Sequence, residues 1–94
     1  MSTVRTVHVR IEGRVQGVGY RAWVERQAQE MSLTGWVRNR RDKSVETVLQ
    51  GAPELVSELL KKCERGPTDA HVTKVEILGE GVGAYSKFEV LPTA

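Results

Sequence analysis

Residues 13–21 read GRVQGVGYR, a glycine-rich connection between two stretches of different periodicity. Before it, apolar and polar residues alternate, and this period of two predicts a strand over about 4–12. After it, apolar residues recur every three or four positions, which predicts an amphipathic helix over about 20–33. The apolar positions are Val7, Val9 and Ile11 in the strand and Tyr20, Trp23, Val24, Ala28 and Met31 in the helix. The stretch is therefore a strand-to-helix turn that contains three glycines and reaches Arg21 in the first turn of the helix.

The rest of the chain continues this pattern of strands, helices and short connections. Gly35 is expected to stop the first helix, and Pro53 suits the first position of a second helix. Residues 41–44 have the length of a hairpin loop, and residues 79–85 form a glycine-rich loop. The remaining expected elements are strands over 36–40, 45–50, 71–78 and 87–91 and a second helix that ends at Gly66-Pro67.

This order of elements, β-α-β-β-α-β with a short extra strand, predicts a fold class. It is the split βαβ or ferredoxin-like plan of α+β proteins, an antiparallel sheet with two helices on one face. A chain of 94 residues is long enough for one small core, and no internal repeat or linker divides it. We therefore expect a single domain that spans residues 1–94.

Composition narrows the possible functions. The formal net charge is only +2, far from the basic balance of a dedicated nucleic-acid-binding protein, so we expect no nucleic-acid partner. The single cysteine, Cys63, excludes an intrachain disulfide, and its place in an apolar stripe predicts a core residue. His8 and His71 are isolated and are expected to face solvent, so no metal site is expected. We find neither a signal peptide nor an apolar run of membrane length, and we expect a cytoplasmic protein with no membrane partner.

A glycine-rich turn before a helix is a candidate anion-binding site. The first N–H groups of a helix have no partner within it and carry part of the positive end of the helix dipole. Gly17 and Gly19 let an anion approach the backbone closely, and Arg21 offers a guanidinium fork that suits phosphate oxygens. The spacing G-x-x-x-G-x-G matches neither common nucleotide-binding signature, so on spacing alone a phosphate site and a plain tight turn both stay open.

Two blocks of the sequence give a more specific indication. Residues 13–21 and the strand GWVRN at 35–39 resemble the two signature blocks of the acylphosphatase family. The Gly-Pro pair at 66–67 and FEVLPT at 88–93 also resemble that family, so the resemblance covers essentially the whole chain. It implies a small protein of the split βαβ plan that hydrolyses acyl phosphates to a carboxylate and inorganic phosphate.

The resemblance also implies roles for individual residues. It makes Arg21 and Asn39 catalytic, with Arg21 binding the phosphate group and Asn39 orienting the attacking water. The implied phosphate-binding loop consists of Val15, Gln16, Gly17, Val18, Gly19 and Tyr20. No metal and no cofactor are implied. The implied partners are a small acyl phosphate as substrate and inorganic phosphate as product and competitive inhibitor, and we expect the chain to act as a monomer.

Two other functions compete with this interpretation. RNA-recognition domains share the β-α-β-β-α-β order, but the strands over 4–12 and 45–50 have no aromatic residue on which a base could stack. The basic residues Arg38, Arg40 and Arg41 fit either a nucleic-acid contact or a solvated edge. The second alternative is a module that handles phosphate or carbamoyl phosphate beside other domains.

The hairpin loop departs from the acylphosphatase pattern. The family usually has Asp-Gly where this chain has Asp42-Lys43. A short hairpin often needs a residue at positive φ, which glycine adopts freely. Lys43 therefore either adopts that conformation or marks a different type of turn.

Overall fold

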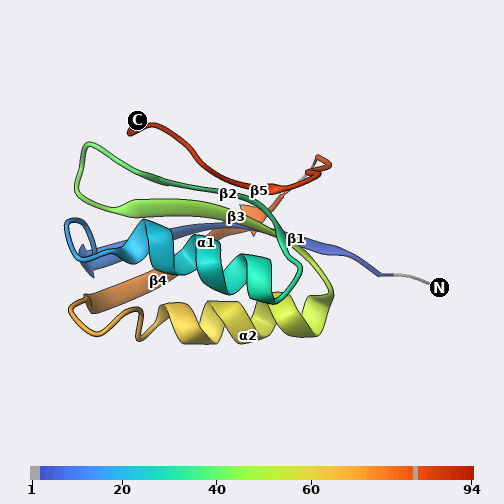
Figure 1. Cartoon of the computed structure of the whole chain (residues 1–94), viewed down its shortest axis with the longest axis horizontal. Helices are drawn as coiled ribbons and strands as arrows, with labels where there is room; N and C mark the ends of the chain where they lie inside the picture. The colour runs from blue at the N-terminus through green and yellow to red at the C-terminus, as the bar shows by residue number, and fades with distance from the viewer. Residues whose placement is uncertain (1–2, 82) are drawn as a thin grey trace.

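The computed structural model describes residues 3–81 and 83–94, which form two layers (Figure 1). Residues 1–2 of the predicted single domain and residue 82 of the predicted loop 79–85 lie outside the described residues. Both helices cover one face of a five-stranded sheet, as the order of elements predicts. In chain order the elements are β1 (Arg5–Arg14), α1 (Tyr20–Glu30), β2 (Thr34–Asn39), β3 (Val45–Gly51), α2 (Pro53–Cys63), β4 (His71–Glu80) and β5 (Phe88–Val90).

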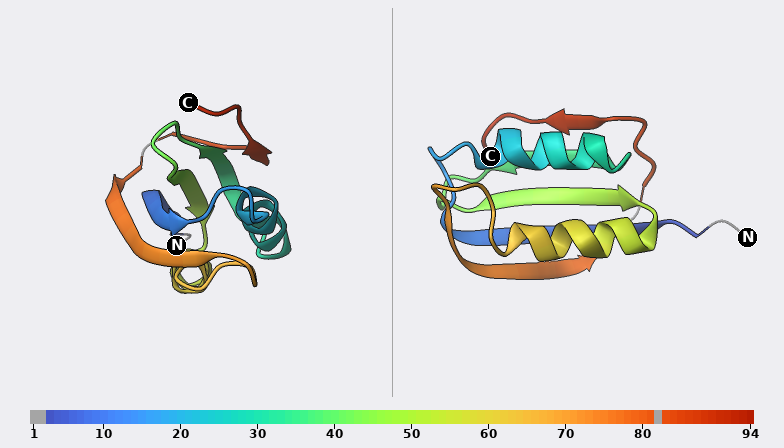
Figure 2. Two further views of the ribbon diagram at one scale, coloured as in Figure 1. Left: turned by 90° about the vertical axis from the view of Figure 1, so that its left-hand side faces the viewer. Right: turned by 60° about the horizontal axis from the view of Figure 1, so that its bottom comes forward.

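The strands lie in the order β4-β1-β3-β2-β5. The neighbours β4-β1, β1-β3 and β3-β2 are antiparallel, which confirms the ferredoxin-like split βαβ plan. The short strand β5 pairs parallel to β2, with Val90 opposite Val37, so the complete sheet is mixed. Figure 2 shows the sheet curling around the two helices, with β4 and β5 at its edges.

The core lies between the helices and the sheet, at the positions that the apolar periodicity predicts. Val7, Val9 and Ile11 of β1 are all 0% exposed. The buried helical residues are Tyr20, Val24 and Ala28 in α1 and Val56, Leu59 and Cys63 in α2. Burial of apolar area stabilises this packing by roughly 25 cal/mol per Å². Both helices contribute to the same core cluster as the inward-facing residues of the sheet.

The C-terminal end of α1 differs from the prediction. The helix ends at Glu30, and the residue that reverses the chain is Ser32, at φ 56. Ser32 N–H donates to Gln29 O at 3.2 Å, and Leu33 N–H donates to Ala28 O at 2.8 Å. These two bonds form a Schellman cap, in which a serine holds the left-handed position that glycine usually takes.

Gly35, the predicted helix stop, lies inside β2 instead. A Cβ atom at this position would come within 2.0 Å of Val48 O on the neighbouring strand. Gly35 therefore permits the close approach of β2 to β3. The prediction that it stops the first helix was wrong, because glycine is needed here for packing between strands.

The boundaries of α2 agree better with the sequence. Pro53 is its first residue, as predicted, and the helix ends at Cys63, three residues before Gly66. Gly66 has φ 69, and a Cβ atom on it would come within 2.5 Å of the Tyr20 ring. The turn after α2 thus packs directly against the first residue of α1.

Three segments that are distant in sequence meet at one end of the molecule. They are the loop between β1 and α1, the β2–β3 hairpin and the C-terminal residues after β5 (Figure 1). Ala94 N–H donates to Asn39 O at 3.0 Å, and Arg41 N–H donates to Ala94 O at 2.8 Å. This end of the fold therefore brings the glycine loop to the part of β2 that carries Asn39.

Candidate active site

The loop between β1 and α1 is shaped by two of the three glycines in its sequence block. Gly13 lies within β1 and pairs with Val72 of β4. Gly17 and Gly19 lie in the loop itself, at φ 75 and φ 81, where a residue with a Cβ atom is strained. A Cβ atom at either loop position would meet no described atom within 4 Å. Backbone conformation, and not packing against the protein, is therefore what requires glycine at these two positions.

The first turn of α1 leaves backbone donors without helical partners. Gly19 is the N-cap, and Trp23 N–H makes the first helical bond, to Gly19 O at 3.0 Å. The N–H groups of Tyr20, Arg21 and Ala22 precede that bond and have no acceptor within the helix. Among the described residues, no side chain caps this end and the first turn contains no acid. The positive end of the helix dipole therefore faces the loop without a compensating carboxylate from the helix turn.

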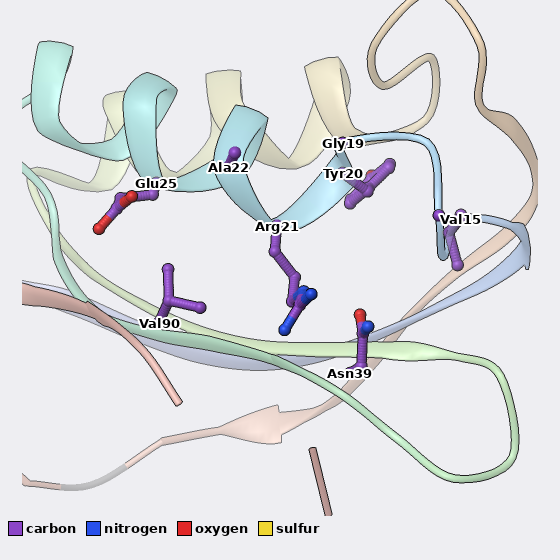
Figure 3. A pocket seen from close by; sticks show the side chains of 9 residues that line it. Val15, Gly19, Tyr20, Arg21, Ala22, Glu25, Asn39 and Val90 are labelled. Carbon is purple, nitrogen blue, oxygen red and sulfur yellow. The ribbon is translucent and has the colours of Figure 1, made fainter. Parts of the chain in front are cut away.

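A cavity of about 290 Å³ lies beside this helix end, between α1 and the strands β2 and β5. Figure 3 shows Arg21 of the helix and Asn39 of the sheet pointing toward one another in it. Arg21 makes no ion pair with a carboxylate of the described chain. The cavity is lined by Val15, Gly17, Gly19, Tyr20, Arg21, Ala22, Glu25, Asn39 and Val90. It therefore brings together the loop, the guanidinium and the amide that the two sequence blocks contain.

Asn39 is fixed through its backbone and unpartnered at its side-chain oxygen. It is the last residue of β2, it pairs with Val45 of β3, and its carbonyl accepts a hydrogen bond from Ala94. Its Oδ1 is buried and has no hydrogen-bond partner within residues 3–81 and 83–94. Buried acceptors without a protein partner are uncommon in folded proteins. This one belongs to a residue that lines the cavity, so it is available to a molecule bound there.

The six predicted loop residues divide between the cavity and the surrounding structure. Those that line the cavity are Val15, Gly17, Gly19 and Tyr20. Gln16 points its side chain elsewhere, and its Nε2 donates to Arg40 O and Ser44 O at 2.8 Å each. Val18 packs against the hydrophobic core. The Gln16 side chain therefore connects the loop to the β2–β3 hairpin and fixes the position of one relative to the other.

Tyr20 anchors the start of α1 to the end of α2. Its side chain is 1% exposed, and its hydroxyl donates to Cys63 O at 2.6 Å. Burial raises the pKa of Tyr20, so the hydroxyl stays protonated and keeps this bond. Cys63 is 0% exposed, which confirms it as a core residue, and burial raises the pKa of its thiol to about 12.

A second polar group lies on the opposite, helix-free face of the sheet. This open-face cluster consists of Glu46 on β3, Arg38 on β2, Arg40 just after β2 and His8 on β1. Glu46 is only 5% exposed, and it accepts hydrogen bonds from Arg38 Nε at 2.7 Å, Arg40 Nη1 at 2.9 Å and His8 Nε2. Burial alone raises the pKa of Glu46, but the hydrogen bonds from Arg38, His8 and Arg40 outweigh it and lower the pKa to about 2.

The open-face cluster corrects the expectation for His8. His8 is half-buried and bonded to Glu46, whereas His71 is exposed as expected. The cluster also accounts for two of the three basic residues noted in the sequence, because Arg38 and Arg40 are paired with Glu46. The Arg38 guanidinium lies over the Trp36 ring, 4.8 Å from its centroid. These charges are therefore largely satisfied within the protein.

Three lining residues were not identified from the sequence. Ala22 and Glu25 follow Arg21 along α1, and Glu25 lies four residues after it, on the same face of the helix. The spacing of four residues from Arg21 could have identified Glu25 as a neighbour of the site from the sequence alone. Val90 reaches the cavity only because β5 pairs parallel to β2, and nothing in the sequence pattern specifies this pairing.

Across residues 3–81 and 83–94, no three His, Cys, Asp or Glu side chains are grouped so that they could hold a metal ion. Neither helix in that part of the chain has the length and apolar character needed to cross a membrane.

Comparison with known proteins gives a consistent result. The profile of the acylphosphatase family matches residues 7–90. An acylphosphatase of Rhodopseudomonas palustris (strain BisB18) is 48% identical over 99% of this chain and 99% of its own. An acylphosphatase of Bradyrhizobium diazoefficiens is 50% identical, over 93% of this chain and 94% of its own. The solved structure of an acylphosphatase from Coxiella burnetii superposes with a TM-score of 0.89 at 37% identity and covers 94% of this chain and 93% of its own.

Proposed function

Because the chain belongs to the acylphosphatase family, we propose that it hydrolyses small acyl phosphates, R–CO–O–PO₃²⁻, to a carboxylate and inorganic phosphate. The family assignment makes the chain a hydrolase that acts on acid anhydrides. Different groups of the cavity hold the phosphoryl group and the attacking water.

The phosphoryl group binds at the start of α1 in this proposal. The N–H groups of the loop and of the first helical turn donate to its oxygens, and the Arg21 fork donates to two of them. The phosphoryl group keeps its negative charge through a loose transition state, so preorganised donors are the main source of catalysis. The proposed phosphate-binding residues are Val15, Gln16, Gly17, Val18, Gly19, Tyr20 and Arg21.

Asn39 holds the attacking water. Its Oδ1 accepts a hydrogen bond from the water, whose lone pair then points at phosphorus. The new P–O bond forms as the bridging P–O bond breaks, and the electron pair of the broken bond leaves on the carboxylate. The carboxylate is a weak base and needs no acid to depart. The proton of the water passes to a phosphoryl oxygen, since an amide cannot accept it at neutral pH.

One observation carries the proposal: the buried Oδ1 of Asn39, without a partner among the described residues, shares a cavity with Arg21. Glu25 is the only carboxylate among the lining residues described. It lies beyond Arg21 as seen from Asn39, so it is poorly placed to take a proton from a water on Asn39 (Figure 3). This arrangement supports proton transfer to the substrate itself.

The RNA-binding alternative has less support. The Trp36 ring, the aromatic residue on β2, already contacts the Arg38 guanidinium, and both Arg38 and Arg40 are paired with Glu46. These guanidinium groups are already engaged within the protein, which leaves them less available to a nucleic acid. We propose in addition that the chain works in the cytoplasm as a monomer without metal or cofactor.

Hydrolysis of benzoyl phosphate tests the proposal. We expect turnover that a chelator does not change, and inorganic phosphate should raise KM without lowering kcat. Carbamoyl phosphate in the same assay tests the second alternative, because a strong preference for it over benzoyl phosphate would favour that alternative. A folded protein that hydrolyses neither compound would overturn the proposed function.

A further inference from the structure

In the proposed mechanism the phosphoryl group and the water occupy the end of the cavity near the loop, and the other end is left free. Its walls there are Ala22 and Glu25 of α1 and Val90 of β5. We infer that Glu25 selects the acyl group, by disfavouring acyl phosphates that carry a second carboxylate and favouring those whose acyl group is neutral or cationic. This inference rests on the proposed function, because it assigns the other half of the cavity to the phosphoryl group.

The position of Glu25 follows from the helix. It lies four residues after Arg21, which puts both side chains on one face of α1, and Figure 3 shows its carboxylate on the side of Arg21 away from the loop. A phosphoryl group held by the loop and by Arg21 therefore leaves the Glu25 end of the cavity for the substituent on the carbonyl carbon.

The charge of Glu25 is not compensated by the protein. The side chain is half-buried, and no described cation lies within ion-pair distance of it. Water screens a half-buried charge less than an exposed one, so Glu25 should interact electrostatically with a charge on the substrate beside it. Glu46, in contrast, has its charge satisfied by three donors and cannot act on a substrate in this way.

The other two walls are small and apolar. Ala22 and Val90 offer contact to the carbon skeleton of an acyl group and no donor that would compensate a carboxylate. An acyl group with a second carboxylate would lose hydration there and meet a like charge. An ammonium group on the acyl chain would instead meet the counter-charge that the protein leaves unpaired.

A matched substrate series separates charge from shape. The three substrates are benzoyl phosphate, 4-carboxybenzoyl phosphate and 4-(trimethylammonio)benzoyl phosphate. The measured quantity is kcat/KM for each charged substrate divided by kcat/KM for benzoyl phosphate. For the carboxylate substrate, this ratio should be about three- to tenfold higher in Glu25→Gln than in the wild type. The relative kcat/KM of the cationic substrate should fall by a similar factor. Both changes should shrink in ~1 M salt, where the Debye length is about 3 Å.

The control is Glu30→Gln, which makes the same charge change at an exposed position on the same helix. It should leave both ratios at their wild-type values. Equal changes for all three substrates in Glu25→Gln would overturn the inference, because Glu25 would then act through Arg21. Unchanged ratios would overturn it as well. Failure of the wild-type protein to hydrolyse any of the three would instead overturn the proposed function, and this inference with it.

Discussion

On the helix-covered face of the sheet, Asn39 buries its Oδ1 without a partner among the described residues; on the opposite face, Glu46 is buried with three hydrogen-bond donors. The two residues are close in the fold, since Arg38 and Arg40 flank Asn39 on the chain and both bond to Glu46. Strand β2 thus carries on one face an amide whose Oδ1 has no partner among the described residues and on the other Arg38, which pairs with Glu46 of β3.

The difference between the two faces indicates that one set of residues serves catalysis and another serves the stability of the fold. A buried polar group that meets its partners contributes to the fold, whereas one without partners detracts from it. Changes in the cavity should therefore affect the rate and leave the free energy of unfolding nearly unchanged. Changes in the open-face cluster should affect the free energy of unfolding and largely spare the rate.

Arg21→Lys should have the largest effect. A lysine keeps the positive charge but cannot reproduce the planar fork, so kcat/KM for benzoyl phosphate should fall by about 100-fold or more. The free energy of unfolding should change by less than about 0.5 kcal/mol, because Arg21 makes no ion pair with the described carboxylates. Steady-state kinetics and urea unfolding measure the two quantities. Arg26→Lys, at an exposed position of the same helix, is the control. A near-normal rate in Arg21→Lys would contradict the proposal that the guanidinium binds two phosphoryl oxygens.

Asn39→Ala should have the next largest effect. The proposed water loses its acceptor, so kcat should fall about 100-fold while the inhibition constant for inorganic phosphate changes little. Removal of the buried, unpartnered acceptor should leave the free energy of unfolding unchanged or raise it by up to about 1 kcal/mol. Inhibition kinetics and urea unfolding decide the outcome. A large loss of phosphate affinity would move Asn39 from the water to the phosphate-binding groups.

Glu46→Gln tests the satisfied side of the comparison. The pKa of Glu46 is about 2 in the folded protein, below its ordinary 4.5, so its ionised form stabilises the fold. This contribution is complete above about pH 4.5 and is lost as the pH falls toward 2. The substitution should therefore lower the free energy of unfolding by about 1–3 kcal/mol at neutral pH and by little near pH 2.

Urea unfolding across that pH range measures the effect of Glu46→Gln. Glu89→Gln is the control, because Glu89 is exposed and lies 4.0 Å from its cation, Lys87. That variant should change stability little at any pH. The kcat/KM of Glu46→Gln for benzoyl phosphate should stay within about threefold of wild type. A large loss of rate at full stability would assign Glu46 to the cavity and end the contrast between the two faces.

Much of the helix-covered face could be predicted from the sequence, because it depends on local patterns. Alternation in β1 and the stripe in α2 specify the core, and the two sequence blocks contain Arg21 and Asn39, which the fold brings to one cavity. Their roles, and that of the loop, stay predictions. Glu25 was within reach of the sequence, since it lies one helical turn after Arg21.

The rest depends on pairings that local pattern does not encode. His8, Arg38 and Glu46 come from three strands, and only the register of the sheet brings them together. Val90 needs the parallel pairing of β5, which is set by the path of the whole C-terminal segment. Ser32 ends α1 in a conformation for which serine gives no signal.

Ser32→Gly should have a smaller effect that involves neither face. Ser32 is at φ 56, in the left-handed region that costs a residue with a Cβ atom about 1 kcal/mol. Glycine removes this strain but is more flexible in the unfolded chain, so a net gain of about 0.5 kcal/mol is expected. Thermal unfolding measures it. Ser57→Gly, inside α2, is the control for added glycine and should destabilise by about 0.5 kcal/mol or more, because glycine is a poorer helix former than serine and Ser57 Oγ loses its hydrogen bond from Arg5. Destabilisation by Ser32→Gly would mean that the serine side chain supports the cap.

Lys43→Gly should have an effect as small as that of Ser32→Gly, and it acts on the hairpin between β2 and β3. Lys43 is at φ 81, so it adopts the positive-φ conformation that was one of the two possibilities for this hairpin. The turn is held by Asp42, whose Oδ1 accepts Ser44 N–H at 2.9 Å and Ser44 Oγ at 2.6 Å, and by Lys43 N–H bonding to Arg40 O at 3.1 Å. None of these bonds uses the lysine side chain.

Relief of the strain at Lys43 should therefore raise the free energy of unfolding by a few tenths to about 1 kcal/mol, reduced by the greater flexibility of glycine in the unfolded chain. Lys43→Ala is the control, because it removes the side chain and keeps the strain, and it should leave stability near wild type. Both variants should keep kcat/KM within about twofold, since the hydrogen bonds of the hairpin hold Asn39 and Glu46 in place regardless of residue 43. If Lys43→Gly instead lowers stability, or lowers the rate at unchanged stability, the lysine at the tip of the hairpin contributes to holding β2 and β3, and the two faces are coupled through it.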